Sequence, residues 1–194
     1  MRRTFAVMIA LALLVATPAI AMADSTRQQA INAVIARALS QRGVPYAYGG
    51  GNSAGASLGT ASVETPAVTA DASLGATPLS NAVVPGLTTV PSPVAEPPRV
   101  SRVGFDSSGL VLYAFAGVGI KMPRSSGEQY KVGRKILPSQ ALPGDLIFYG
   151  PEGSQSVAMF VGNGQMVEAT DPAVTVSPVR TNGMAPYLSR IIEY

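Results

Sequence analysis

A stretch of 48 residues constrains the fold of this 194-residue chain more than any other feature of the sequence. Residues 51–98 hold nine alanines and seven prolines, and no aromatic residue, lysine or arginine. Such a segment cannot bury enough apolar surface to offset its conformational entropy. We expect a disordered insertion over 51–98, or a lid that orders when a ligand binds. The folded domain must then be built from the flanking segments, residues 24–50 and 99–194.

The N-terminal end has the pattern of a secretory signal peptide. Two arginines precede an apolar run over residues 5–15, and residues 21–23 (Ala-Met-Ala) fit the small-x-small cleavage rule. We expect residues 1–23 to be removed before Asp24. The apolar run is too short to span a bilayer and no later segment qualifies, so we expect an exported protein without a membrane span. Its location would be periplasmic, in the cell wall or in the medium.

The sequence contains no cysteine and no histidine. This composition excludes disulfides, thiolate nucleophiles, Cys/His zinc sites and a histidine general base. No Ser-His-Asp or Cys-His catalytic site is therefore possible in this chain. Only scattered carboxylates remain as metal ligands, and we expect neither a metal ion nor an organic cofactor.

The net charge gives no reason to expect a nucleic-acid partner, because the formal value of +3 falls to about +1 without the two leader arginines. One stretch is locally basic. It predicts either a solvated helix face or a contact surface for an anionic polymer or a carboxylate-bearing peptide. Its cations are Lys121, Arg124, Lys131, Arg134 and Lys135.

Helical patterns precede strand patterns along the chain. Apolar residues at helical spacing predict a helix over Ser25–Arg42 that Gly43 ends, and a second helix follows Asp106. The spacing of Ser125 and Glu128 predicts the capped start of a third, short helix near residues 127–132.

Strand patterns begin at Leu142, and Asn163-Gly164 joins two of the runs in a hairpin. "VTVSPV" and "YLSRIIEY" are further strand candidates. Helices followed by antiparallel strands predict an α+β domain, with N-terminal helices packed on an antiparallel sheet. Without leader and insertion about 120 residues remain, enough for one small domain, which we expect to be a monomer.

Six segments in this order resemble the NlpC/p60 family of peptidoglycan peptidases, which have a papain-like fold. They are "GVPYAYGGG", "GFDSSGLVLYAF", "GIKMPRSSGEQY", "PGDLIFYG", "SVAMFVGNGQMVEA" and "PYLSRIIEY". Further details look most like mycobacterial cell-wall members, the group that interacts with resuscitation-promoting factors.

The resemblance implies that the catalytic positions have degenerated. Ser107 stands where the family has its nucleophilic cysteine, and Ser156 stands where it has its histidine base. Glu168 matches the third, orienting residue. A serine without a base cannot replace a thiolate, so the resemblance implies an inactive homologue of a cysteine endopeptidase. We expect Asp106, Ser107, Ser156 and Glu168 to line one groove.

Substrate-cleft residues carry over as well. Tyr46 matches the family's cleft tyrosine, Asp106 and Ser108 flank the nucleophile position, and Arg124 and the neighbouring lysines could meet carboxylates of a stem peptide. Alternatively, Tyr46 packs against the main helix. Asp106 has capping of that helix as its alternative.

The leading interpretation is therefore an exported, non-catalytic peptidoglycan-binding protein that holds stem peptides in the former active-site cleft and targets or modulates cell-wall hydrolases. Two alternatives remain open. One is an active or altered endopeptidase that uses Ser107, for example with a lysine as its base. The other is a protein-interaction scaffold whose partner is another cell-wall enzyme.

Overall fold

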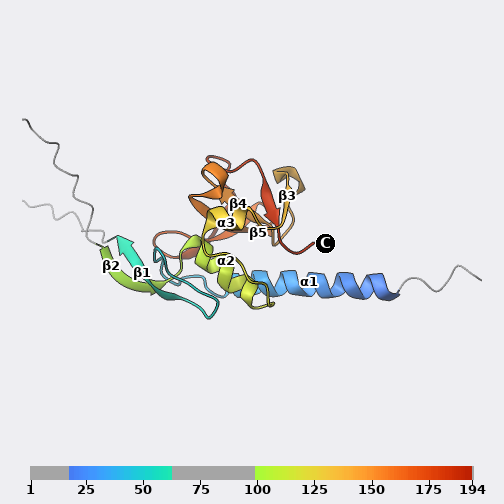
Figure 1. Cartoon of the computed structure of the whole chain (residues 1–194), viewed down its shortest axis with the longest axis horizontal. Coiled ribbons are helices and arrows are strands. Elements are labelled where there is room, and N and C mark those ends of the chain that lie inside the picture. The colour runs from blue at the N-terminus through green and yellow to red at the C-terminus, as the bar shows by residue number, and fades with distance from the viewer. Residues whose placement is uncertain (1–17, 63–98, 194) are drawn as a thin grey trace, which may run out of the picture. The chain divides into compact units, whose positions relative to one another are not determined.

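The computed structural model of the chain describes residues 18–62 and 99–193 (Figure 1). Most of the predicted signal peptide and the predicted insertion from residue 63 to residue 98 lie outside these ranges. Within the described residues, no helix is both long enough and apolar enough to cross a membrane.

Helix α1 runs over Pro18–Leu39, so it begins before the expected Ser25 and ends before Arg42. Residues 40–43 form turns instead of a further helical turn, and Gly43 takes a φ of +84°. Only glycine adopts this left-handed backbone conformation at no cost, which is why the helix ends here.

Two shorter helices follow. Helix α2 covers Ser107–Ala116 with Asp106 as its N-cap, and helix α3 covers Ser126–Tyr130 with Ser125 as its N-cap. The Ser125 hydroxyl accepts a hydrogen bond from the backbone N–H of Glu128 at 3.3 Å. This contact confirms the predicted cap, although the helix ends two residues earlier than expected.

The described residues also form eight strands, six of them in one antiparallel sheet of order β3-β8-β4-β5-β6-β7. Asn163 and Gly164 both have positive φ and form the predicted turn between β5 and β6. Helices followed by an antiparallel sheet confirm the α+β class. The sheet strands are β3 Arg134–Ile136, β4 Leu146–Tyr149, β5 Ser156–Gly162, β6 Gln165–Ala169, β7 Val174–Pro178 and β8 Leu188–Arg190, and the 3₁₀ helices are η1 Pro138–Gln140 and η2 Pro151–Gly153.

Strand β1, Ser57–Ser62, pairs with β2, Arg99–Gly104, in a separate two-stranded sheet. The expected boundary of the insertion at residue 51 therefore differs from the structure. Thr60 and Tyr48 exchange two backbone hydrogen bonds, with N···O distances of 2.6 and 2.9 Å. Gly59 permits this close approach, since a Cβ there would lie 2.6 Å from the Tyr48 carbonyl oxygen. Backbone pairing, which composition does not reveal, orders this segment.

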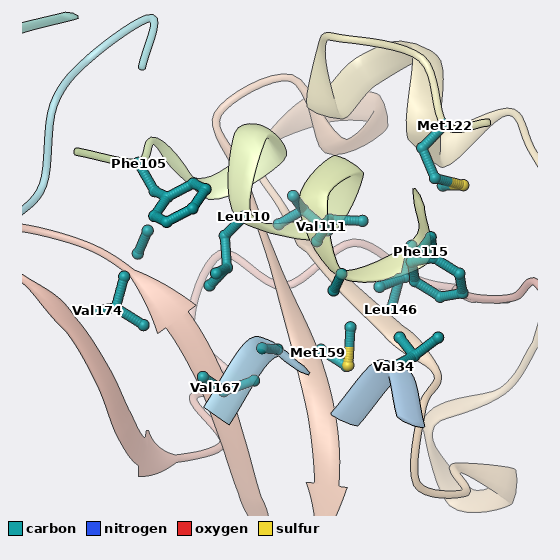
Figure 2. Packing of buried hydrophobic residues seen from close by; sticks show 14 of the residues in the cluster. Val34, Phe105, Leu110, Val111, Phe115, Met122, Leu146, Met159, Val167 and Val174 are labelled. Atoms are coloured by element: carbon teal, nitrogen blue, oxygen red, sulfur yellow. The ribbon is translucent and has the colours of Figure 1, made fainter. Parts of the chain in front are cut away.

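The two faces of the six-stranded sheet bury two separate hydrophobic clusters. The first lies between the sheet and helices α1 and α2, where Val34, Leu110 and Phe115 meet residues of β4, β5 and β6 (Figure 2). The second, on the opposite face, contains Tyr149 and Met166. Since α2 packs directly on the sheet, its first residue is held in a fixed position relative to β5.

A buried ion pair joins the residue just before β4 to the end of strand β8. Arg190 donates from Nε to Asp145 Oδ1 at 2.8 Å and from Nη2 to Asp145 Oδ2 at 2.7 Å. The two side chains are 8% and 1% exposed. Asp145 also accepts a hydrogen bond from the backbone N–H of Leu142 at 2.7 Å. Removing one partner of such a pair is strongly destabilising, because the remaining buried group loses its opposite charge.

We expect Asp145→Ala to lower the free energy of unfolding by about 3–5 kcal/mol, since it removes the carboxylate that forms the buried ion pair with the Arg190 guanidinium. Urea denaturation measures the change. The matched control is Glu193→Ala, which breaks the half-exposed Arg134–Glu193 pair and should cost less than about 1 kcal/mol. Equal effects of the two variants would contradict the structural role of the buried pair.

Candidate functional site

A groove of about 450 Å³ opens at the start of α2. Three loops form its other walls: the segment after α1, the segment that leads into α3, and the segment before β5. Most of its lining side chains carry hydroxyl groups. The lining residues are Tyr46, Tyr48, Gly49, Asp106, Ser107, Ser108, Arg124, Ser125, Ser126, Ser154 and Gln155.

Asp106 holds the start of α2. Its Oδ1 accepts hydrogen bonds from the Gly109 N–H at 2.7 Å and from the Ser108 hydroxyl at 3.2 Å. Its Oδ2 accepts from the Gly49 N–H at 3.0 Å. The expected N-cap is therefore present, and the same carboxylate also fixes the loop on the opposite wall of the groove.

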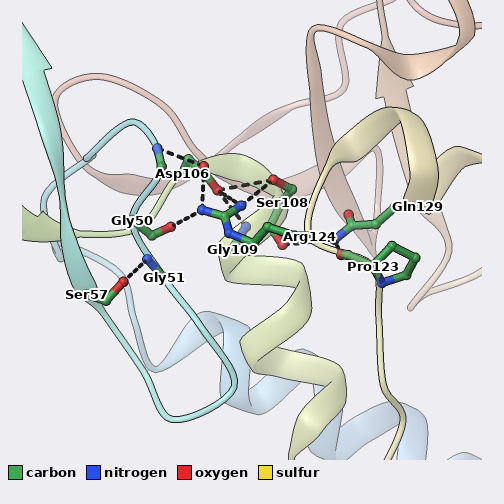
Figure 3. Close-up of polar contacts among 10 residues, drawn as sticks. Gly50, Gly51, Ser57, Asp106, Ser108, Gly109, Pro123, Arg124 and Gln129 are labelled. Carbon is green, nitrogen blue, oxygen red and sulfur yellow. Dashed lines mark hydrogen bonds and ion pairs between the residues drawn. The ribbon is translucent and has the colours of Figure 1, made fainter.

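Arg124 pairs with this carboxylate in a two-pronged contact (Figure 3). Its Nη1 and Nη2 donate to the two Asp106 carboxylate oxygens at 2.9 and 2.8 Å. Nη1 also donates to the Ser108 hydroxyl at 2.9 Å, and Nη2 to the Gly50 carbonyl at 3.0 Å. Four of the five guanidinium N–H donors are thus used within the protein.

This network changes the expected roles of Asp106, Ser108 and Arg124. The Asp106 carboxylate already accepts five hydrogen bonds on about four lone-pair positions. The Arg124 charge is compensated, so a bound carboxylate could form a two-pronged contact with it only by displacing Asp106. The three side chains shape the groove instead of offering free charges to a ligand.

Ser107 is the first residue of α2 and lines the groove. It is half-buried, and its hydroxyl has no hydrogen-bond partner among the described residues. Asp106, Ser107, Ser108 and Tyr46 thus meet in one groove as the sequence suggested.

Ser156 and Glu168 are not among the residues that line this groove. Ser156 opens β5 opposite Tyr149 and directly follows Gln155, which does line the groove. Glu168 lies on the face of the sheet opposite to α2, among the residues around Tyr149. The lining residues thus include Asp106 and Ser107 but not Ser156 or Glu168, and the grouping of all four residues stays a prediction.

Glu168 is held by an arginine that the sequence analysis did not single out. Arg180 donates from Nη1 and Nη2 to the two carboxylate oxygens at 2.5 and 2.7 Å, and the Ser177 hydroxyl donates at 2.6 Å. Burial alone would raise the pKa of Glu168, but these hydrogen bonds and the Arg180 charge outweigh it and lower the pKa. Arg180 packs over the ring of Tyr149, with 4.8 Å between the guanidinium carbon and the ring centroid.

Tyr46 combines its two expected roles. It packs against the first hydrophobic cluster and also lines the groove. Burial, with the negative charge of Asp106 nearby, raises the pKa of its phenol above the usual value of 10.0. Tyr46 is therefore a neutral hydrogen-bonding group at any pH near 7.

The basic stretch does not form one continuous surface. Lys121 lines a different cleft, beside the end of α2. Arg134 pairs with Glu193, while Lys135 donates to the Ser189 hydroxyl at 2.9 Å and lies 3.5 Å from the centroid of the Tyr130 ring. Burial lowers the pKa of Lys135. Lys131 is exposed and ends α3.

Sequence reasoning did not identify Tyr48, Ser126, Ser154 and Gln155 as groove residues. Tyr48 directly precedes the glycine run, and Gln155 directly precedes Ser156. The only sequence feature that could have identified these two residues was that they lie next to positions already recognised. No cluster of three or more carboxylates that could hold a metal ion occurs among the residues that the structure describes.

We expect the Glu168–Arg180 pair to make stability depend on pH. A lowered folded-state pKa means that the contribution is present above the ordinary glutamate value of 4.5 and is lost as the pH falls below it. The stability difference between the wild type and Glu168→Gln, measured by urea denaturation, should shrink between pH 7 and about pH 3. Glu193→Gln is the exposed control. A difference that stays constant over this range would contradict the shift.

Comparison with known proteins supports the resemblance. The model of the NlpC/P60 family matches residues 92–193. Peptidoglycan endopeptidase RipA of Mycobacterium tuberculosis is 48% identical over 169 residues, and peptidoglycan endopeptidase RipB of the same organism is 46% identical over 169 residues. Each alignment covers 86% of this chain, which spans only 28% of the length of RipA and 55% of that of RipB.

Solved structures agree with the sequence matches. The P60 domain of an antigen from M. avium paratuberculosis is 49% identical, with a TM-score of 0.64 over 88% of this chain and 98% of that domain. RipD from M. tuberculosis, described as a non-catalytic NlpC/p60 domain protein adapted to peptidoglycan binding, is 48% identical. Its TM-score is 0.61 over 84% of this chain and 98% of the RipD chain. Since the family model matches more than half of the sequence and the fold agrees, this chain belongs to the NlpC/P60 family.

Proposed function

We propose that this protein is an exported, non-catalytic peptidoglycan-binding module that uses the groove at the start of α2. The proposal rests above all on one observation, the absence of cysteine and histidine from the whole chain. The family resemblance implies that Ser107 stands at the nucleophile position, so the proposed groove would lack the groups that cleave a peptide bond.

The chemistry of the groove supports this proposal. A serine nucleophile needs a neighbouring base. The Asp106 carboxylate beside Ser107 is saturated with hydrogen bonds, and the Glu168 carboxylate is paired with Arg180. All three lysines lie in the described part of the chain, and none of them lines the groove. A Ser–Lys mechanism therefore gains no support from the geometry.

The relatives support both the binding role and the need for a test. RipD is described as non-catalytic and adapted to peptidoglycan binding, whereas RipA and RipB are named endopeptidases. Export fits the signal-peptide pattern of residues 1–23 and a ligand that lies outside the cytoplasm. Stem peptides and glycan strands are the two parts of peptidoglycan that the groove could hold.

Co-sedimentation tests the proposal. We expect the full chain, as its host processes it, to pellet with purified insoluble mycobacterial peptidoglycan and to release no muropeptides. Ser107→Ala should still pellet and should leave the supernatant equally free of fragments.

Two other outcomes would contradict the proposal. Muropeptides released by the wild type but not by Ser107→Ala would show an endopeptidase that uses this serine. Protein that stays in the supernatant without any fragments would favour a scaffold that binds another cell-wall enzyme. Charge reversal at Lys131 and Arg134 would then show whether those residues contact the partner.

Restoring the family's reacting groups is a second test. We expect Ser107→Cys combined with Ser156→His to release muropeptides at least about 10²-fold faster than either single variant, since a thiolate needs its base. Fragment analysis by mass spectrometry measures the release. Ser107→Ala with Ser156→His is the control for the added histidine. If the double variant releases nothing, the assignment of Ser107 and Ser156 to the catalytic positions is contradicted.

A further inference from the structure

The groove offers a ligand no free charge among its side chains. Its one cation, Arg124, and its one anion, Asp106, are bonded to each other through both Nη groups and both carboxylate oxygens. A ligand carboxylate that enters the groove would lose water without gaining a free cation, and such burial is unfavourable. A charged ligand group is therefore a poor match for this surface.

The hydrogen-bonding side chains that remain in the groove are neutral. Hydroxyl and amide groups that form no hydrogen bond within the described part of the chain come from all its walls. They belong to Tyr46, Tyr48, Ser107, Ser126, Ser154 and Gln155. Groups of this kind both donate and accept, as needed for a ligand that carries many hydroxyls and amides.

Tyr48 adds an aromatic surface. Its side chain is 67% exposed, which is unusual for a large ring, and it lines the groove. Two backbone hydrogen bonds with Thr60 of β1 fix the Tyr48 backbone at the groove. An exposed ring at this position can pack on a flat, weakly polar face whose C–H groups point toward its electron-rich surface.

We propose that the groove recognises an uncharged N-acetylated saccharide, the chemistry of a peptidoglycan glycan strand, with Tyr48 packed against a sugar ring. This inference rests on the proposed function and names the part of the polymer that is bound. A pyranose ring supplies the C–H face, its hydroxyls and acetamido group match the free hydroxyls and the Gln155 amide, and it brings no charge. The carboxylates of a stem peptide meet no free cation here.

The test is titration of the ¹⁵N-labelled protein with a β-1,4-linked N-acetylglucosamine oligomer and, separately, with a free stem tripeptide. We expect the oligomer to shift the amide signals of Tyr48, Ser107 and Gln155. Its Kd should change less than about twofold between low salt and about 0.5 M NaCl, because no ion pair forms. The tripeptide should bind more weakly.

Variants of Tyr48 locate the contact. Tyr48→Ala should weaken binding of the oligomer about fivefold or more, whereas Tyr48→Phe keeps the ring and should retain affinity within about twofold. The matched control is Tyr187→Ala, since Tyr187 is 44% exposed and does not line the groove. Tyr48→Leu keeps apolar bulk without the aromatic face and guards against misfolding of the alanine variant.

Three results would overturn the saccharide assignment: no shifts with the oligomer, unchanged affinity in Tyr48→Ala and Tyr48→Leu, or tighter, salt-sensitive binding of the tripeptide. Whole peptidoglycan separates these results from failure of the proposed function. If the protein pellets with whole peptidoglycan but ignores the oligomer, only the saccharide assignment fails. If it does not pellet, the binding function itself fails.

Discussion

The bond between Asp106 and Arg124 organises the functional end of this molecule. One carboxylate caps α2, fixes the loop at Gly49 and pairs with the residue that leads into α3. Three chain segments far apart in sequence therefore meet at a single polar point. Without that point, the loops at Gly49 and Arg124 would not be held against the start of α2, because loops of this kind have no hydrophobic core of their own.

The same bond shows why a family resemblance does not transfer residue roles one by one. Asp106 and Arg124 carry the charges that a peptide ligand would be expected to meet, but these two side chains form an ion pair with each other. What a ligand meets instead is a set of neutral hydroxyls, an amide and an exposed ring. Our proposals on binding follow from this distinction between charges that are present and charges that are free.

The rest of the domain serves to hold that end rigid. Helix α2 packs on the sheet through residues such as Leu110 and Phe115, and the Asp145–Arg190 pair ties the start of β4 to the last sheet strand. On the opposite face of the sheet, an ion pair with Arg180 holds Glu168. The Glu168 carboxylate thus has hydrogen-bond partners within this chain, although the chain lacks the histidine that the family resemblance implies beside it.

The amino-acid sequence alone predicted the α+β class, the N-cap at Asp106, the short helix at Ser125 and the turn at Asn163-Gly164, because these depend on residues close together in the chain. It also determined the absence of a thiolate and an imidazole, which is a matter of composition. Local patterns were insufficient for β1, whose order comes from pairing with β2 and Tyr48 across the chain.

Which polar groups are free, in contrast, follows from the folded structure. Arg124, Arg134 and Lys135 look alike in the sequence, but their partners are Asp106, Glu193 and Ser189, and no spacing rule connects residues so far apart. The pairing of Glu168 with Arg180 was likewise not predictable from the sequence. A charge acts on a ligand only when the fold leaves it unpaired, and pairing depends on distances in space that the chain order does not contain.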